Sequence, residues 1–334
     1  MKLSLEDGPQ AADDLQALYA PVRAELEAVE AIVRNDFLSD DPFVGQLARH
    51  GFRLGGKRLR PALVLLSAKV CGAVKPSHLV LGAVMEVIHT ATLLHDDVLD
   101  EAEIRRHLDT VNARWGNESS ILLGDYLLAL AIDKIGSLDS PFACRAIGQA
   151  AKTVCEGELR QVRWRGNFDL GEQDYMAIIA DKTAELTACC CLVGAHYADG
   201  SPETCNRLAA FGRQIGIAFQ IADDLLDMTG EETVVGKSLG SDLAKQKATL
   251  PLIRLLAQVH GAQRKELLEI LTRPDNHRAA ALRPWFSQSD AVAYAQAKAA
   301  EHSRRAVAQL DGLPASEACA ALAGLAAYVV NRRQ

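Results

Sequence analysis

Apolar residues recur every three to four positions along most of the chain, which is the period of an α-helix. Alternation with a period of two, typical of strands, is hardly visible, and no Rossmann or P-loop glycine pattern is present. The chain is rich in Ala, Leu, Glu and Arg, and only 5% of its 334 residues are aromatic, a composition that favours helix. We therefore predict an all-α fold. The predicted helices are residues 13–36, 60–72, 77–100, 118–136, 141–163, 172–197, 202–229, 249–272, 289–311 and 315–332.

The breaks between these segments are short and marked by Gly or Pro, so no linker divides the chain into separate units. We predict one domain over residues 1–334, in which residues 1–24 form an N-terminal extension or the first helix. The polar stretch RPDNHRAAALRPWFSQ, residues 273–288, is the longest interruption of the helical pattern. We expect a loop there.

Charge and cysteine usage limit the class of protein. The net charge of −7 argues against a general nucleic-acid-binding protein. Eight cysteines are present without a C-x-x-C pair, and we expect reduced, buried thiols. The first residues lack the apolar core of a signal peptide, and no uninterrupted apolar run reaches the roughly 20 residues that span a bilayer. We expect a soluble, cytoplasmic protein without a transmembrane segment.

A first acidic cluster ends one of the apolar helices. The segment TATLLHDDVLDEAEIRRH, residues 90–107, places Asp96, Asp97 and Asp100 directly behind an apolar run. At about 100° per residue, Asp100 lies about 40° from Asp96 around the helix, whereas Asp97 lies about 100° to one side. Ionised carboxylates one turn apart repel each other, and Mg²⁺ is a cation that such oxygen ligands suit. Taken alone, the cluster is also explained as a solvated acidic helix end.

A second cluster repeats the same arrangement. In FGRQIGIAFQIADDLLDMTG, residues 211–230, an apolar helix runs into Asp223, Asp224 and Asp227, with Gln220 close to the face that Asp223 and Asp227 share. Two separate D-D-x-x-D clusters, each at the end of a buried helix, are hard to explain as solubilising charge. If they face each other, they would hold a cluster of Mg²⁺ ions and a polyanionic ligand such as a diphosphate.

Basic residues that would match such an anion occur around the first cluster and in three other segments. Each one alone is more often a surface charge, and a lone His is more often a core residue. Together with the two acidic clusters they indicate a site for two diphosphates, one bound through metal and one through Lys and Arg alone. The candidates are Lys57, Arg58 and Arg60 in GGKRLRP, His89 on the Asp96 face, Arg105 and Arg106, Lys182 beside Thr183, and Lys237 and Lys247.

The order of these motifs resembles that of the trans-isoprenyl diphosphate synthase, or polyprenyl synthase, family. GGKRLRP, IHTATLLHDDVLDEAEIRR, GDYLLA, EGEL, KTAEL, FQIADDLLD and GKSLGSDL follow one another from about residue 25 onwards. IHTATLLHDD and the ending AAYVVNRR are most similar to the long-chain octaprenyl and solanesyl branch. The resemblance implies antiparallel helices around a central cavity, a cytoplasmic homodimer, and Mg²⁺-dependent 1'-4 condensation of isopentenyl diphosphate with an allylic diphosphate. Peripheral membrane contact for product release is compatible with it.

The resemblance also implies roles for individual residues. The metal ligands for two or three Mg²⁺ ions would come from the six aspartates, above all Asp96, Asp100 and Asp223. The residues expected to act in catalysis are Asp96, Asp100, Arg105, Lys182, Asp223 and Lys237. The residues expected to grip the allylic diphosphate are Arg105, Lys182, Thr183, Gln220, Lys237 and Lys247. Those expected to hold isopentenyl diphosphate are Lys57, Arg60, His89 and Arg106. No side chain is assigned as a general base, because the departed diphosphate can accept the proton.

Three residues depart from the usual family pattern. His107 stands where Gly commonly follows the paired arginines, and a position that needs φ > 0 would tolerate His poorly. Arg160 replaces a residue that is commonly apolar, and we expect it at a helix edge rather than in the cavity. Gln246 also stands where Gly is usual. None of the three removes an expected ligand, so they bear on loop geometry rather than on reaction class.

Small residues upstream of Asp96 suggest the length of the product. A growing prenyl chain would extend along this helix, and Ala91 and Thr92 lie about one turn back, with Ile88 farther down. This open turn predicts a product longer than C15, although both small residues are also explained by close helix packing. A short-chain farnesyl or geranylgeranyl diphosphate synthase and a non-catalytic helical subunit of a synthase remain alternatives.

Overall fold

The computed structural model describes residues 15–54, 56–138, 140–229, 241–273 and 278–331. Within these ranges all regular secondary structure is helical apart from one two-stranded hairpin, so the predicted all-α fold class is confirmed. The first half contains η1 (Ala20–Val22), α2 (Arg23–Asp36), α3 (Pro42–Arg53), α4 (Leu59–Cys71), α5 (Pro76–Leu99), β1 (Ile104–Arg105), β2 (Leu108–Asp109), α6 (Val111–Trp115), α7 (Asn117–Gly136) and α8 (Pro141–Trp164).

The second half begins with three helical segments that follow one another without a loop. These are α9 (Glu172–Ile179), a short π-helix η2 (Ala180–Ala184) and α10 (Glu185–Tyr197). The remaining helices are α11 (Pro202–Thr229), α13 (Ser241–Ala244), α14 (Leu250–Gln258), α15 (Gly261–Thr272), α16 (Arg278–Ser287), α17 (Ala291–Ala308) and α18 (Glu317–Asn331).

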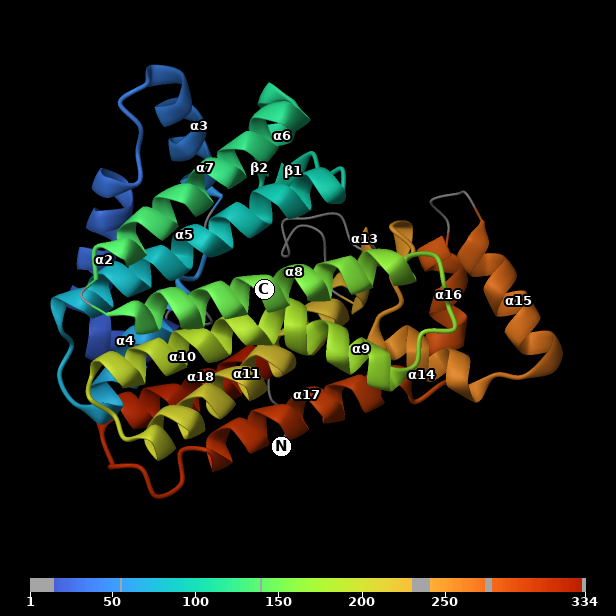
Figure 1. Cartoon of the computed structure of the whole chain (residues 1–334). Coiled ribbons are helices and arrows are strands. Elements are labelled where there is room, and N and C mark those ends of the chain that lie inside the picture. The colour runs from blue at the N-terminus through green and yellow to red at the C-terminus, as the bar shows by residue number, and fades with distance from the viewer. Residues whose placement is uncertain (1–14, 55, 139, 230–240, 274–277, 332–334) are drawn as a thin grey trace.

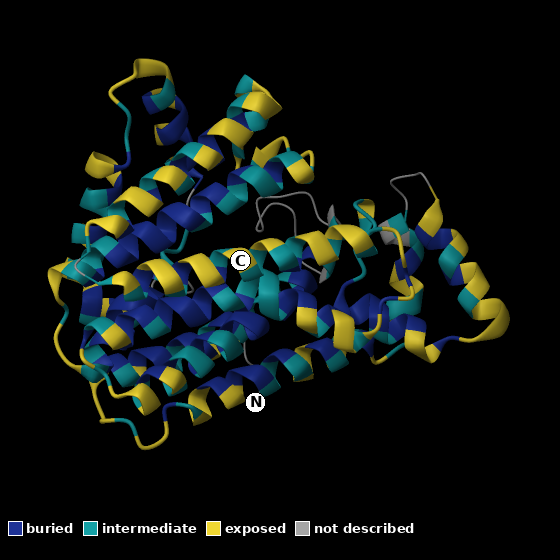
Figure 2. Ribbon diagram, in the orientation of Figure 1, coloured by how far each residue is buried: buried dark blue, intermediate teal, exposed yellow. Residues whose placement is uncertain are grey.

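The helices α4, α5, α10 and α11 form the centre of the molecule. Helix α10 packs against α11 and α4, and α4 packs against α5. Helix α7 lies along α5, and α17 lies along α11, on opposite sides of this centre (Figure 1). Buried residues follow the four central helices, whereas α7, α8 and α15 turn an exposed face outwards (Figure 2). The long helices α5 and α11 therefore belong to one core. Each of them carries one acidic cluster at its C-terminal end.

Helix α5 has the length and hydropathy of a membrane span, but 67% of its most apolar window is buried inside the protein. Leu81, Val84, Met85 and Val87 on it are fully buried. We attribute its hydropathy to this central position, because a helix that is apolar all round is expected in the core of a large protein.

Several predicted elements differ from the structure. The loop expected at 273–288 is wrong for most of its length, because residues 278–287 form α16, whose Leu282 is buried in a satellite core. The predicted helix 249–272 is interrupted at residues 259–260 and forms α14 and α15. Helix α3 was not predicted, although Asp41 caps it by accepting hydrogen bonds from the backbone N–H groups of Phe43 and Val44 at 2.9 and 3.0 Å.

All eight cysteines are free thiols, but only some of them are buried. Cys189, Cys190 and Cys191 lie inside α10, and Cys205 is buried as well. The expectation of buried thiols is wrong for Cys144 and Cys155, which are exposed on α8. Both lie on the outward face of that helix, so helix amphipathicity does not place them in the core.

Close contact between α10 and α4 depends on a glycine. A Cβ atom built at Gly194 would lie 2.2 Å from the backbone oxygen of Val64 and 3.1 Å from the Cβ of Ser67. The neighbouring atom is backbone, which cannot move aside as a flexible side chain can. The distance between the two central helices is therefore set by the absence of a side chain at residue 194.

We predict that Gly194→Ala lowers the free energy of unfolding by about 1–3 kcal/mol, the usual range for an overpacked core. Gly148→Ala is the matched control, because Gly148 is exposed inside α8 and a Cβ there would meet nothing within 4 Å. The control should raise the unfolding free energy by up to about 1 kcal/mol through helix propensity alone. Chemical denaturation of both variants measures the difference, and equal stability would contradict the close-contact argument.

Candidate active site

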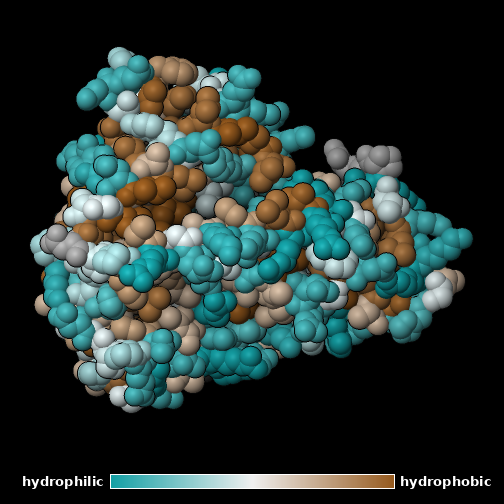
Figure 3. Space-filling view, viewed as in Figure 1, coloured by the Kyte–Doolittle hydropathy of each residue, from teal (hydrophilic) through white to brown (hydrophobic). Residues whose placement is uncertain are grey.

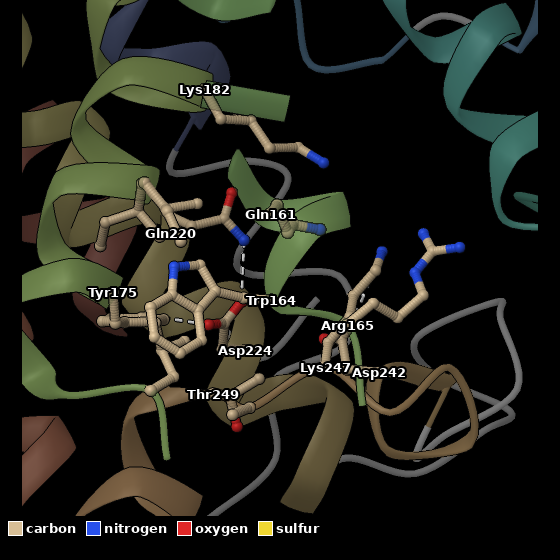
Figure 4. Close-up of a pocket in the computed structure, with 14 residues that line it drawn as sticks. Gln161, Trp164, Arg165, Tyr175, Lys182, Gln220, Asp224, Asp242, Lys247 and Thr249 are labelled. Atoms are coloured by element: carbon tan, nitrogen blue, oxygen red, sulfur yellow. Dashed lines mark hydrogen bonds and ion pairs between the residues drawn. The ribbon is translucent and has the colours of Figure 1, made fainter. Parts of the chain in front are cut away.

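A cavity lies where the ends of α8 and α11, the helix α9, the π-helix η2 and the segment 241–249 meet. Its apolar lining residues include Trp164, Leu170 and Ile179. Its polar lining residues include Lys182, Gln220, Asp224, Asp242, Arg165 and Lys247. Figure 4 shows the amino group of Lys182 pointing towards the open space beside Gln220, with Arg165 and Lys247 on the opposite side. Three residues expected to grip an anion, Lys182, Gln220 and Lys247, thus line one cavity.

The first acidic cluster reaches this cavity through Asp100. Nζ of Lys247 donates to its two carboxylate oxygens at 3.0 and 2.9 Å, and Lys245 and Arg165 each approach it to 3.3 Å. Burial would raise the pKa of the Asp100 carboxyl, but Lys247 and Lys245 outweigh burial and hold that pKa below its ordinary value. Asp100 therefore carries negative charge at the boundary between α5 and the segment 241–249.

Asp96 and Asp97 differ in their surroundings. Burial raises the pKa of Asp96, and the neighbouring carboxylates of Glu158 and Asp100 add to this, while Lys182 acts in the opposite direction. Asp97 is buried, and its Oδ1 accepts hydrogen bonds from Nε and Nη2 of Arg105, both at 2.8 Å. Asp96 thus lies near the cavity residue Lys182, whereas Asp97 holds Arg105 in place.

The second acidic cluster shows the same division. Asp224 is buried and accepts hydrogen bonds from the hydroxyl of Tyr175 at 2.7 Å and from Nε2 of Gln220 at 2.8 Å. Burial raises the pKa of Asp224 to about 8. Asp223 is half-buried, and Asp227 is buried with its Oδ2 accepting a hydrogen bond from the backbone N–H of Asp242 at 3.1 Å. In each cluster the middle aspartate has protein partners that orient it.

The π-helix η2 positions the next pair of predicted residues. It carries Lys182 and Thr183 between α9 and α10, and such local π-turns are frequent at functional sites. A Cβ at Gly157, the glycine of EGEL, would lie 2.5 Å from the backbone nitrogen of Lys182. The glycine therefore allows α8 to approach η2, where Glu158 forms an ion pair with Lys182. Asp96 and Glu158 outweigh the effect of burial and raise the pKa of Lys182, which stays charged.

Thr183 belongs to the same polar network. Its hydroxyl donates to Oε1 of Gln220 at 2.8 Å, and Gln220 in turn donates to Asp224. Gln220 therefore uses its carbonyl oxygen and its amino group on protein partners from two helices. This network fixes the orientation of the α11 residues that face the cavity.

A second group of cations gathers around His89 on α5. Burial lowers the pKa of His89 far below its ordinary value, and the positive charges of Arg60, Arg105 and Arg106 lower it further. The imidazole is therefore neutral. Nε of Arg60 is buried and has no hydrogen-bond partner among the described residues. A buried donor without a partner indicates that an acceptor, such as an anion, is to be supplied.

The other residues of GGKRLRP differ in what they contact. A Cβ at Gly56 would lie 2.1 Å from Nη1 of Arg106, so the glycine lets the GGKRLRP segment touch the hairpin. Lys57 places its Nζ 5.5 Å from the ring centroid of Tyr328. Arg58 has a different role, because it donates to Glu86 at 2.7 Å and also pairs with Glu30. The structure thus brings Arg60, His89 and Arg106 together and directs Arg58 into the fold.

The hairpin β1–β2 shows which backbone conformation His107 adopts. Arg105 pairs with Leu108, so Arg106 and His107 form a two-residue turn, and their φ angles are 51° and 62°. A turn with positive φ at both central residues is the type I′ turn, in which Gly is favoured at the second position. The expectation that His107 occupies a position suited to Gly is confirmed.

The other two departures are also placed by the structure. Gln246 has a φ of 56°, and its backbone oxygen accepts from the N–H of Gly166 at 3.0 Å, so it holds a left-handed conformation beside the end of α8. Arg160 is exposed and forms an ion pair with Asp181, at the helix edge as expected. Lys237 lies outside the described residues.

The residues expected to control product length lie on α5. Ala91 is fully buried, and Ile88 is 5% exposed. Thr92 is half-buried, and its hydroxyl donates to the backbone oxygen of His89 at 2.8 Å. Ala91 is therefore part of the core, and Thr92 is the more open of the two small residues.

A divalent cation fits the donor set, although the described residues form no preassembled cage. No group of three His, Cys, Asp or Glu side chains in the described part of the chain is close enough to enclose a metal ion. The carboxylates of Glu158 and Asp100 nevertheless add to the effect of burial and raise the pKa of Asp96, and a cation near Asp96 would remove that repulsion. Mg²⁺ takes only one or two carboxylates in such sites and completes its shell with water and phosphate oxygens.

We predict that His107→Gly raises the free energy of unfolding by about 1 kcal/mol, because Gly adopts the left-handed conformation of the turn without steric cost. His107→Ala is the matched control, since it removes the imidazole but keeps the strained backbone. Thermal or chemical denaturation measures both. A destabilised His107→Gly variant would show that imidazole contacts outweigh the strain in the turn.

Comparison with known proteins agrees with this geometry. The family model described as polyprenyl synthetase matches residues 41–285. The chain is 34% identical to an all-trans-nonaprenyl-diphosphate synthase (geranyl-diphosphate specific) of Rhodobacter capsulatus, over 97% of this chain and 100% of that protein. It is 36% identical to a short chain isoprenyl diphosphate synthase of Methanothermobacter thermautotrophicus, over 85% of this chain and 89% of the relative.

A solved structure is similar over the whole fold. The polyprenyl synthase of Caulobacter crescentus CB15, complexed with calcium and isoprenyl diphosphate, superposes with a TM-score of 0.91 at 33% identity. The match covers 96% of this chain and 98% of that chain. The family model spans most of the chain, and relatives at 34% identity or more cover it almost fully, so the chain belongs to the polyprenyl synthetase family.

Proposed function

We propose that this chain joins isopentenyl diphosphate to an allylic prenyl diphosphate, head to tail, and releases an all-trans polyprenyl diphosphate longer than C15. One observation carries the proposal. Two separate cationic groups lie beside the first acidic cluster, Lys182 and Lys247 at the cavity and Arg60 and Arg106 around His89. Two cationic groups suit two diphosphates, whereas an enzyme acting on one diphosphate needs only one.

The proposed reaction depends on stabilising the negative charge that develops on the departing diphosphate. The C–O bond at C1 of the allylic substrate breaks, and diphosphate departs with the electron pair. Lys182 and Lys247 stabilise that developing charge, and bound Mg²⁺ would add electrostatic stabilisation of the same kind. The double bond of isopentenyl diphosphate then forms a bond to C1, and a proton leaves from C2 to the departed diphosphate. Apolar residues such as Trp164 and Ile179 exclude water from the cation.

The two substrates divide between the two cationic groups. The allylic diphosphate belongs with the metal side, where Asp96, Asp100, Asp223 and Asp227 would hold two or three Mg²⁺ ions. Isopentenyl diphosphate belongs with Lys57, Arg60, His89 and Arg106. Neutral His89 donates one hydrogen bond without adding charge, which suits a position already surrounded by arginines.

A homodimer is part of the proposal. Helices α7 and α8 expose large apolar side chains, among them Leu122 at 66%, Ile132 at 67% and Leu159 at 70%. In Figure 3, brown side chains gather along α7 and on α8, on the side facing the viewer. An apolar face of this kind favours association, and we infer that a second copy of the chain covers it. Sedimentation of the purified protein, giving the mass of one or two copies, tests this assignment.

Incubation of the purified chain with isopentenyl diphosphate, Mg²⁺ and each allylic primer in turn tests the function, with product mass as the measurement. We expect polyprenyl diphosphates longer than C15, and no turnover after chelation of divalent cations. Asp96→Asn should lower kcat by about 10²-fold or more, because it removes a charge that acts in the transition state. Asp40→Asn, at an exposed site just before α3, is the matched control. A product of C15 or shorter would identify a short-chain synthase instead.

Product length should depend on the size of residue 92. We predict that Thr92→Phe shortens the main product by one or more five-carbon units, because the added ring occupies space one turn below Asp96. Thr92→Val has almost the same volume as Thr and also lacks the hydroxyl that contacts His89, so it controls for the lost hydrogen bond. Mass spectrometry of the products measures both variants. An unchanged product from Thr92→Phe would exclude this position as the limit on length.

A further inference from the structure

Arg165 lies at the point where α8 ends and lines the same cavity as Lys182 and Lys247. No sequence motif singled it out. Its position is set by the backbone, because the next residue, Gly166, has a φ of 76° and donates its N–H to the backbone oxygen of Gln246 at 3.0 Å. This hydrogen bond ties the end of α8 to the segment 241–249 and directs the Arg165 side chain towards Asp100.

The guanidinium of Arg165 has weak partners. Nη2 lies 3.3 Å from Oδ1 of Asp100, and Nη1 lies 3.4 Å from the backbone oxygen of Leu99. Its Nε is buried and has no hydrogen-bond partner among the described residues. A guanidinium carries five N–H donors, so two long contacts leave most of its capacity unused. Lys247, by contrast, donates to the same carboxylate at 2.9 and 3.0 Å.

The charges around Arg165 are unbalanced towards positive. Lys245, Lys247 and Arg165 all lie within 3.3 Å of the Asp100 carboxylate. Asp242 lies 4.0 Å from Lys247, and the Asp97 carboxylate also interacts with Lys245. In the described part of the chain, three cations therefore gather on the single carboxylate of Asp100. Such an excess of positive charge, in a partly buried place, favours an anionic ligand.

We propose that Arg165 is a further diphosphate-binding residue, which exchanges the Asp100 carboxylate for phosphate oxygens when the allylic substrate enters the cavity. A phosphate group offers the paired acceptors that a planar guanidinium fits, and such bidentate contacts are stronger than those of a point charge. The proposal rests on the proposed function, because it takes the allylic diphosphate to lie between Lys182 and Lys247. Arg165 would be an additional phosphate-binding side chain, on the opposite side of the cavity from Lys182 (Figure 4).

Arg165→Met tests the inference, since it removes the charge and keeps much of the length of the side chain. We expect the affinity for inorganic pyrophosphate, measured by calorimetry in Mg²⁺, to fall about tenfold, the loss typical of one charge-assisted contact. The KM of the allylic diphosphate should rise by a similar factor, and that of isopentenyl diphosphate should stay within about twofold. Arg165→Lys should recover part of the loss. Arg163→Met, exposed on the same helix, should bind pyrophosphate as the unaltered chain does.

Equal pyrophosphate affinity in Arg165→Met and the unaltered chain would overturn the inference, whatever happens to thermal stability. A lower melting temperature with unchanged affinity would show that Arg165 only fastens the end of α8. An equal rise in the KM of both substrates would also overturn it, because it would indicate a general distortion. Failure of the unaltered chain to form any polyprenyl product would instead refute the proposed function.

Discussion

The cavity depends on charge compensation between groups that are largely buried. Helices α5 and α11 are apolar for most of their length, and each ends in three aspartates that water reaches only in part. An isolated buried carboxylate is too costly to stay ionised, so each one must find a partner, lose its charge or share a cation. Asp97 forms an ion pair with Arg105, and Asp100 forms one with Lys247. Asp224 accepts hydrogen bonds from Tyr175 and Gln220, and its pKa is raised to about 8.

Close approach of backbone segments brings positively charged side chains to the cavity and to the group around His89. Gly157 lets α8 approach the π-helix that carries Lys182, and Gly56 lets the GGKRLRP segment contact Arg106. A Cβ atom at Gly157 would lie 2.5 Å from the backbone nitrogen of Lys182, so that contact requires glycine, whereas one at Gly56 would meet only the mobile end of the Arg106 side chain. The type I′ turn at residues 106 and 107 then holds two consecutive arginines at the end of a hairpin. The positions of these charged side chains therefore depend on glycines that allow the segments to approach each other closely.

The protein environment also separates residues that the motifs treat alike. Within D-D-x-x-D the middle aspartate of each cluster is held by other side chains, although Asp97 pairs with Arg105 on the hairpin and Asp224 lines the cavity. Arg58 and Arg60 are two residues apart, yet Arg58 pairs with Glu30 and Glu86, and Arg60 keeps an unpartnered Nε. Spacing along the chain gives the face of a helix on which a residue lies, but not the partner that it meets.

The sequence by itself determined the helical class, most of the helices and the chemistry of the site. Helical period and D-D-x-x-D spacing are local properties, so Asp96 and Asp223 were identified without coordinates. The family resemblance pointed to Lys182 and to His107, which stands where Gly is usual. Only the tertiary structure decided that residues 278–287 form a helix, because the packing of Leu282 and Trp285 against α14 and α15 outweighs a polar pattern. It also decided the place of Arg165 beside Asp100, since that contact joins residues 65 positions apart and depends on a backbone hydrogen bond that no local pattern predicts.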